Sequence, residues 1–132
     1  MLNINEKQQS IIELVSRLLL AAIFLISGLN KISNYQGTSQ YMEAMDVPSF
    51  LLPLVIATEV VGALMIILGY KTRLVAFLLA GLCLSSAVLF HFQLADQNQF
   101  IHFFKNLAIA GGFIAVMING AGRISIDNKQ QS

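Results

Sequence analysis

Residues 50–69, FLLPLVIATEVVGALMIILG, form a twenty-residue apolar stretch with one charged side chain, Glu59, at its middle. As a helix, the stretch would span about 30 Å, the thickness of the hydrocarbon core of a bilayer. An acidic residue at the centre of a spanning helix costs roughly 3 kcal/mol on insertion scales. We therefore expect these residues to cross a membrane, with Glu59 facing the interior of a bundle and contacting a polar partner.

The composition extends this assignment to the whole chain. The 132 residues are 56% hydrophobic and 11% charged, with a mean hydropathy of +0.71, whereas soluble domains carry about 25% charge. The length suits a single domain, residues 1–132. A net charge of +1 with scattered basic residues argues against a nucleic-acid partner, and the single cysteine, Cys83, excludes an intrachain disulfide or a Cys-x-x-Cys redox pair.

Four apolar segments of spanning length predict an all-α fold, an integral membrane four-helix bundle in contact with the lipid bilayer. They cover about residues 11–32, 50–69, 73–92 and 101–119. The amino terminus lacks the basic region and cleavage site of a signal peptide, so the first segment is expected to remain as a membrane helix. Residues 1–10, 93–100 and 120–132 are polar and are expected to be a tail, a hairpin and a second tail.

The connection 33–49 allows two interpretations. Tyr41, Met42 and Met45 would form the apolar side of a short helix at the membrane surface, with Thr38 as its N-cap. An ordered loop is the other interpretation.

Basic residues in the flanks predict the orientation in the membrane. One side would hold five of them, and the other would hold Lys31 and Lys105 together with the acids Glu43, Asp46 and Asp96. Both termini are therefore expected to face the cytoplasm. The five are Lys7, Lys71, Arg73, Arg123 and Lys129.

Small residues predict where helices pack closely. Ala76, Ala80, Cys83 and Ala87 form a stripe on the third segment, and Gly111 and Gly112 begin and end small-xxx-small pairs on the fourth. We interpret the stripe as a helix-packing face. Such faces would also serve a homodimer.

Two cations are candidate partners for Glu59. Lys105 would approach it from the outer end of the bundle and Arg17 from the inner end, and we expect Lys105 to form the pair. Arg17 also has a local partner, because Glu13 precedes it by four residues in the favourable order, so these two are assigned to a structural charge network. Whether Glu59 forms a structural ion pair or part of a site stays open at this stage.

A polar cluster is predicted near the outer end of the bundle. Lys31, His91, Lys105 and Asn106 would lie there with Glu59 below them, although Lys31 could instead anchor to lipid headgroups. His91, Lys105 and Asn106 would suit a quinone, whose carbonyls accept hydrogen bonds, or an anionic solute. The ten residues between His91 and His102 do not specify facing haem ligands, so haem is not expected, and no metal site is assigned.

Several stretches of the chain resemble the DoxX family. Residues 24–32, FLISGLNKI, resemble its FxxSGxxK signature, and residues 103–108, FFKNLA, resemble its last-helix FxKNLA stretch. The likeness covers residues 11–127 and also includes the Val47-Pro48 turn, Glu59 with Gly62, Gly69, Arg73, His91, Gly111-Gly112 and the closing GRISID at 122–127. The resemblance implies a four-helix bacterial inner-membrane protein. It also implies a link to quinone-dependent oxidoreduction, because founding members are subunits of a thiosulfate:quinone oxidoreductase or a terminal quinol oxidase complex.

Together these observations favour a membrane subunit of a quinone-linked redox complex, with a redox partner protein. Its intramembrane site would lie near the periplasmic side and would be lined by Glu59, Lys105, Asn106, His91 and Lys31. The alternative is a non-enzymatic scaffold or small-solute carrier whose buried charges are structural. Whether the chain is itself catalytic stays open.

Overall fold

The computed structural model describes residues 3–131. Four helices are long and apolar enough to cross a membrane, and no strand occurs among the described residues. The predicted all-α membrane bundle is thus confirmed. The spanning helices are α1 (Glu6–Ser33), α3 (Leu52–Leu68, preceded by the 3-10 turn η1, Ser49–Leu51), α4 (Thr72–Phe90) and α5 (Gln97–Asn119), and two shorter helices are α2 (Tyr35–Ala44) and α6 (Ile126–Gln131).

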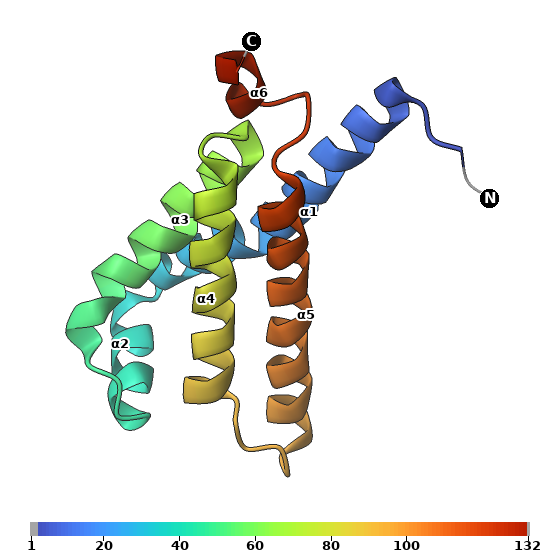
Figure 1. Ribbon diagram of the computed structural model, residues 1–132. Helices are drawn as coiled ribbons and strands as arrows, with labels where there is room; N and C mark the ends of the chain where they lie inside the picture. Colours follow the sequence, from blue (N-terminus) through green and yellow to red (C-terminus); the bar gives the residue numbers. More distant parts are fainter. Residues whose placement is uncertain (1–2, 132) are drawn as a thin grey trace.

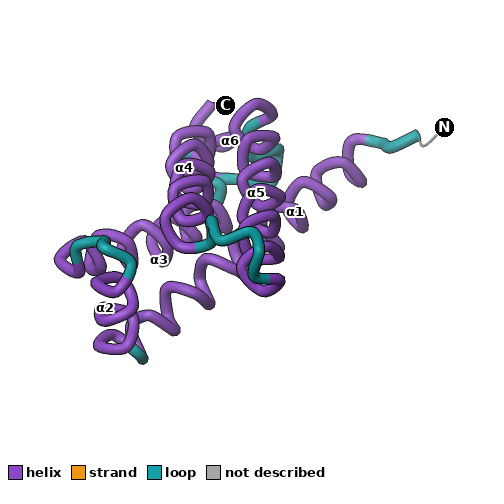
Figure 2. The backbone as a smooth tube through the Cα atoms, turned by 90° about the horizontal axis from the view of Figure 1, so that it is seen from below, coloured by secondary structure: helices purple, strands orange, loops and turns teal. Residues whose placement is uncertain are grey.

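The spanning helices pack chiefly as two pairs, α1 with α3 and α4 with α5. Figure 1 shows both termini, the α3–α4 turn and α6 at one end of the molecule, which we call the terminal end. The opposite, distal end carries α2 and the α4–α5 loop (Figure 1). Viewed from the distal end, α2 lies to one side of the α4–α5 pair, and α1 runs obliquely across the bundle (Figure 2).

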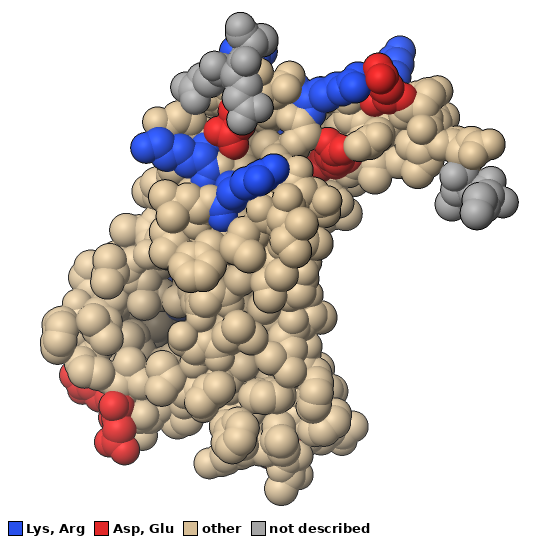
Figure 3. Space-filling model, in the orientation of Figure 1, with Lys and Arg blue, Asp and Glu red and all other residues tan. Residues whose placement is uncertain are grey.

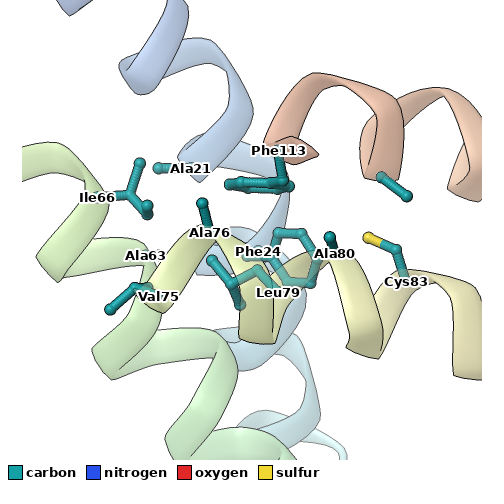
Figure 4. Packing of buried hydrophobic residues seen from close by; sticks show 11 residues of the cluster. Ala21, Phe24, Ala63, Ile66, Val75, Ala76, Leu79, Ala80, Cys83 and Phe113 are labelled. Carbon is teal, nitrogen blue, oxygen red and sulfur yellow. The ribbon is translucent and has the colours of Figure 1, made fainter. Parts of the chain in front are cut away.

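Small side chains allow the helices to approach closely at the centre. Ala76, Ala80, Cys83 and Ala87 are all at most 5% exposed, so the predicted packing stripe is confirmed. In Figure 4, alanines of α4 lie beside the ring of Phe113 from α5 and below Ala21 of α1. Phe24 and Phe113 meet edge to face, with ring centroids 5.5 Å apart, an arrangement that aromatic pairs prefer.

Two helices begin earlier than the sequence predicted. α1 begins at Glu6 because Asn5 and Gln8 form a reciprocal capping box, so residues 6–10 are helical rather than part of a tail. α5 begins at Gln97 because the Asp96 side chain accepts from the N–H groups of Asn98 and Gln99. The predicted starts of both helices were too late for the same reason, because local capping rather than the apolar pattern decides where these helices begin.

The connection between α1 and α3 contains the predicted short helix rather than an ordered loop. Met42 is buried, and Tyr41 stacks on Phe90 of α4 with ring centroids 5.5 Å apart. The predicted N-cap was wrong: Asn34 stands at that position, and Thr38 donates its hydroxyl to the Asn34 carbonyl one turn into the helix. α2 is therefore held against the distal end of α4.

At the terminal end, hydrogen bonds join the chain after α5 to backbone groups of the α3–α4 turn and the start of α4. The Asp127 carboxylate accepts from the N–H groups of Lys71 and Thr72, at 2.7 and 2.9 Å, and its own N–H donates to the carbonyl of Gly69 at 2.8 Å. Burial alone would raise the pKa of Asp127, but the hydrogen bonds from Thr72 and Lys71 outweigh burial and hold the pKa below its usual value. The chain after α5, expected to be a polar tail, thus caps the start of α4.

Arg17 lies beneath this cap and is 1% exposed. Its guanidinium donates to the carbonyl of Ile66 at 3.4 Å and to that of Ile124. Gly69 has φ +71°, and a Cβ there would meet the guanidinium, so only glycine fits this turn. The expected ion pair between Glu13 and Arg17 does not form among the described residues. Glu13 instead accepts a hydrogen bond from Gln9 Nε2 at 2.7 Å.

Replacing Asp127 by Ala should lower the free energy of unfolding by about 1 kcal/mol, the usual cost of losing a side chain that caps a helix. Because the folded-state pKa lies below the unfolded value, the carboxylate stabilises the fold above about pH 4, and this contribution is lost as the pH falls through the folded-state pKa. Unfolding of both proteins in detergent, followed by circular dichroism between pH 3 and pH 7, measures the difference. A gap that widens towards low pH would contradict this assignment.

Candidate functional site

A cavity of about 340 Å³ lies between the helices towards the distal end, and we call it the distal cavity. Its walls come from all four spanning helices and from α2, and the space-filling view shows a hollow on the α3 side of the molecule (Figure 3). The walls are mostly apolar. The polar side chains among them are Ser27, Lys31, Thr38, Tyr41, Glu59, Ser85, Ser86, His91 and Asn106.

An ion pair between Lys31 and Glu59 forms part of the cavity wall. Lys31 Nζ lies 2.9 and 3.1 Å from the two carboxylate oxygens and 2.7 Å from the hydroxyl oxygen of Ser27. The Glu59 side chain is 7% exposed and that of Lys31 is 26% exposed. The three N–H groups of Lys31 are thus engaged by the protein, and the pair has no net charge.

This pairing corrects the sequence-based expectation, because the partner of Glu59 is neither Lys105 nor Arg17. Gly28 is the physical reason: a Cβ at this position would lie 2.6 Å from Val60 Cγ2 and 3.3 Å from Glu59 Cβ. Without a side chain there, α1 approaches α3 closely enough for Lys31, one turn further along, to reach the carboxylate. Lys31 therefore lies in the cavity wall and pairs with Glu59.

Lys105 does not line the distal cavity, although its neighbour Asn106 does. Successive helical residues point about 100° apart, so only one of the two is able to face the cavity. α5 turns the side that carries Ala110 and Phe113 towards the core, and Asn106 lies near that side, whereas Lys105 is exposed on the outside of the bundle. Four of the five predicted site residues therefore line one cavity.

His91 lies at the distal edge of the cavity, at the end of α4. Its Nδ1 is 2.6 Å from Gln99 Oε1. Because an amide oxygen only accepts, Nδ1 carries the hydrogen in this orientation, and Nε2 of the neutral ring is an acceptor. The rings of His91 and His102 are stacked with centroids 5.1 Å apart, but His102 is not part of the cavity wall.

Several polar groups of the cavity make no hydrogen bond within the described part of the chain. They include the Asn106 amide and the Ser86 hydroxyl. Unsatisfied polar groups are costly at membrane depth, where lipid offers no partner. These groups are therefore available to a bound molecule or to water.

Sequence reasoning missed the contribution of α2 and of the serines. Thr38, Tyr41 and Met42 close one wall, and Ser27 supports Lys31. The spacing of Ser27 and Lys31, four residues apart on one face with Gly28 between them, was a usable signal for a paired cation. No local pattern indicated that α2 would cover this part of the bundle.

Comparisons with known proteins agree with the resemblance found in the sequence. The DoxX family model matches residues 12–92, a range that includes Lys31, Glu59 and His91. The inner membrane proteins YqjF and YphA of Escherichia coli (strain K12) are 46% and 37% identical to this chain over 122 and 123 residues. These alignments cover 92% and 88% of this chain, and 94% and 88% of the relatives.

A third relative covers about half of the chain. CatD of Bacillus subtilis (strain 168), whose name provisionally calls it an oxidoreductase, is 33% identical over 67 residues, 51% of this chain and 50% of that protein. No solved structure matches the chain significantly.

Removing either member of the Lys31–Glu59 pair should destabilise the protein by roughly 3 kcal/mol, because the remaining charge would be buried without its partner. We expect this for Lys31→Met and for Glu59→Gln separately. The double variant Lys31→Met with Glu59→Met should recover most of the loss. Unfolding in mixed detergent micelles measures all three, with Lys105→Met as a matched control that changes little.

A double variant as unstable as the single variants would contradict the view that the pair is coupled. A loss of stability in Lys105→Met equal to that in Lys31→Met would contradict the assignment of the partner.

Proposed function

The chain belongs to the DoxX family of inner membrane proteins, and from this premise we propose that it binds the head group of a quinone in the distal cavity. It would do so as a membrane subunit of a quinone-linked redox system. The observation that carries this proposal is a set of unsatisfied polar groups in an apolar cavity at membrane depth. Its volume of about 340 Å³ lies at the lower end of the range for small-molecule sites, about 300–1,000 Å³.

The charge of the cavity favours a neutral ligand over an anionic one. Lys31 and Glu59 neutralise each other, and the three N–H groups of Lys31 are already engaged. An anion would be desolvated in the cavity without an available counter-charge, which is costly in a medium of low dielectric constant. The small-solute carrier reading is therefore less favoured for anionic solutes.

The wall residues supply both kinds of hydrogen-bonding group that a quinone and its reduced form require. The Asn106 amide donates to a carbonyl, and Nε2 of His91 accepts from a hydroxyl. Glu59, held by Lys31, lies against the same space as a carboxylate. A bound quinone would supply two-electron, two-proton chemistry, and the protein would bind it, orient it and offer proton acceptors.

We propose that the electrons come from a partner protein, because this sequence contains one cysteine and therefore no cysteine pair that could carry them. The provisional name of CatD supports a redox role and nothing more specific. The competing proposal is a scaffold, in which the Lys31–Glu59 pair would only hold α1 against α3. The quinone-binding proposal requires a ligand in the distal cavity, whereas the scaffold proposal does not.

Purified protein should bind a short-chain ubiquinone analogue in detergent, and Asn106→Leu should weaken binding about tenfold, the equivalent of one lost hydrogen bond of about 1.4 kcal/mol. Lys105→Gln should leave the affinity unchanged, because Lys105 lies outside the cavity. Isothermal titration calorimetry measures both, with circular dichroism to check folding. Absence of binding by the wild type, with a protein partner retained instead, would favour the scaffold.

The orientation of the chain is also a proposal: both termini face the cytoplasm. The basic side chains gather at the terminal end, as one face of the molecule shows (Figure 3). Because basic residues are retained on the cytoplasmic side, this distribution supports a position of the distal cavity near the periplasmic surface. A carboxy-terminal green fluorescent protein fusion should fluoresce, and an alkaline phosphatase fusion at the same position should be inactive. The reverse result would invert the topology.

A further inference from the structure

A second cavity, of about 640 Å³, lies at the terminal end, and we call it the terminal cavity. Its walls come from the first part of α1, the α3–α4 turn, the end of α5 and the chain that leads into α6. It shares no wall residue with the distal cavity. Its place at the ends of the spanning helices corresponds to the depth of lipid headgroups.

Some charged side chains of this cavity already bind other groups of the protein, and others form no ion pair within residues 3–131. Asp127 is committed to the N–H groups of Lys71 and Thr72, and Arg123 pairs with Glu6 at 2.7 Å. The side chains of Lys71 and Arg73 form no ion pair among the described residues. Glu13 accepts from Gln9 through Oε1, and its Oε2, which lies against Gly122, accepts no hydrogen bond among the described residues. The cations of Lys71 and Arg73 and the carboxylate of Glu13 are thus the charged groups that a ligand could contact.

An apolar groove of about 410 Å³ continues from the terminal cavity between α1 and α5. The groove and the cavity share Glu13, Asn119 and Gly120 as wall residues. The remaining walls of the groove are mainly small or aliphatic side chains, including Leu19, Leu20, Ala115 and Val116. Because α1 crosses α5 obliquely and touches it little, the groove is not filled by protein.

Two glycines leave room where the terminal cavity meets the α1–α5 groove. A Cβ at Gly112 would lie 2.8 Å from Leu20 Cδ2, and one at Gly120, where φ is +82°, would lie 3.2 Å from Arg73 Nε. Any side chain at Gly120 would therefore compete for the space beside the guanidinium. Arg17 lies under the groove, and its buried Nε has no hydrogen-bond partner in the described part of the chain.

We propose that the terminal cavity and the α1–α5 groove together bind one phospholipid with a zwitterionic, phosphoethanolamine-type headgroup. Arg73 and Lys71 bind the phosphate, the carboxylate of Glu13 binds the ammonium, and an acyl chain occupies the groove. Basic pockets at the ends of spanning helices are suited to lipid headgroups. The Glu13 carboxylate distinguishes the headgroup classes, because a phosphoglycerol headgroup carries the same phosphate but only neutral hydroxyls beyond it, and so offers Glu13 no cation.

Lipid retention by the purified protein tests this proposal. Protein exchanged into micelles with equal amounts of phosphatidylethanolamine and phosphatidylglycerol should retain the former about tenfold over the latter by native mass spectrometry. Arg73→Gln should lower the retained lipid about tenfold, and Glu13→Gln should reduce the preference to near unity. Lys105→Gln, which removes an exposed cation at the distal end, is the matched control and should behave as the wild type.

The source of the phosphate is distinguished by a second pair of measurements. Ala115→Leu narrows the groove and should lower lipid retention several-fold, while inorganic phosphate and soluble phosphoethanolamine at millimolar concentration should not displace the lipid. Circular dichroism confirms that each variant is folded. Equal retention of the two lipids by the wild type, unchanged retention in Arg73→Gln, or displacement by soluble phosphate with no effect of Ala115→Leu would each overturn the proposal.

Discussion

The bundle depends on one constraint, that a carboxylate near the middle of an apolar spanning helix must be paired. Glu59 meets this constraint with Lys31, at 2.9 Å. The pair forms only where α1 and α3 lie in close contact, and Gly28 permits that contact by presenting no side chain to Val60. One buried charge thus sets both the packing of two helices and the polar character of the cavity beside them.

The two ends of the molecule satisfy their polar groups differently. At the terminal end, Arg17 bonds to backbone carbonyls of α3 and of the chain after α5, and Asp127 bonds to backbone N–H groups at the start of α4. At the distal end, Asn106 and Ser86 line a cavity and make no hydrogen bond to any of residues 3–131. Groups bonded to backbone stabilise a fold, whereas polar groups that stay unsatisfied at membrane depth point to a ligand.

The functional proposal depends on chemistry that is distributed over several helices. The charge pair comes from α1 and α3, His91 from α4 and Asn106 from α5, while α2 covers one side. Because the pair is neutral and its donors are engaged, we propose a neutral ligand with hydrogen-bonding groups rather than an anion. This conclusion required the contacts of Lys31, since a free lysine at the same place would have favoured an anion.

The sequence by itself determined that this chain is a four-helix membrane bundle, because apolar length and low charge leave no other way to bury so much hydrocarbon. It also named five candidate site residues, of which Lys31, Glu59, His91 and Asn106 line one cavity, because polar side chains in spanning helices tend to face the bundle interior. The pairing of Glu59, the outward position of Lys105 and the cover formed by α2 were decided only by the tertiary structure. Which side chains meet depends on helix rotation and on close approach at glycine, and sequence spacing within one helix does not contain either.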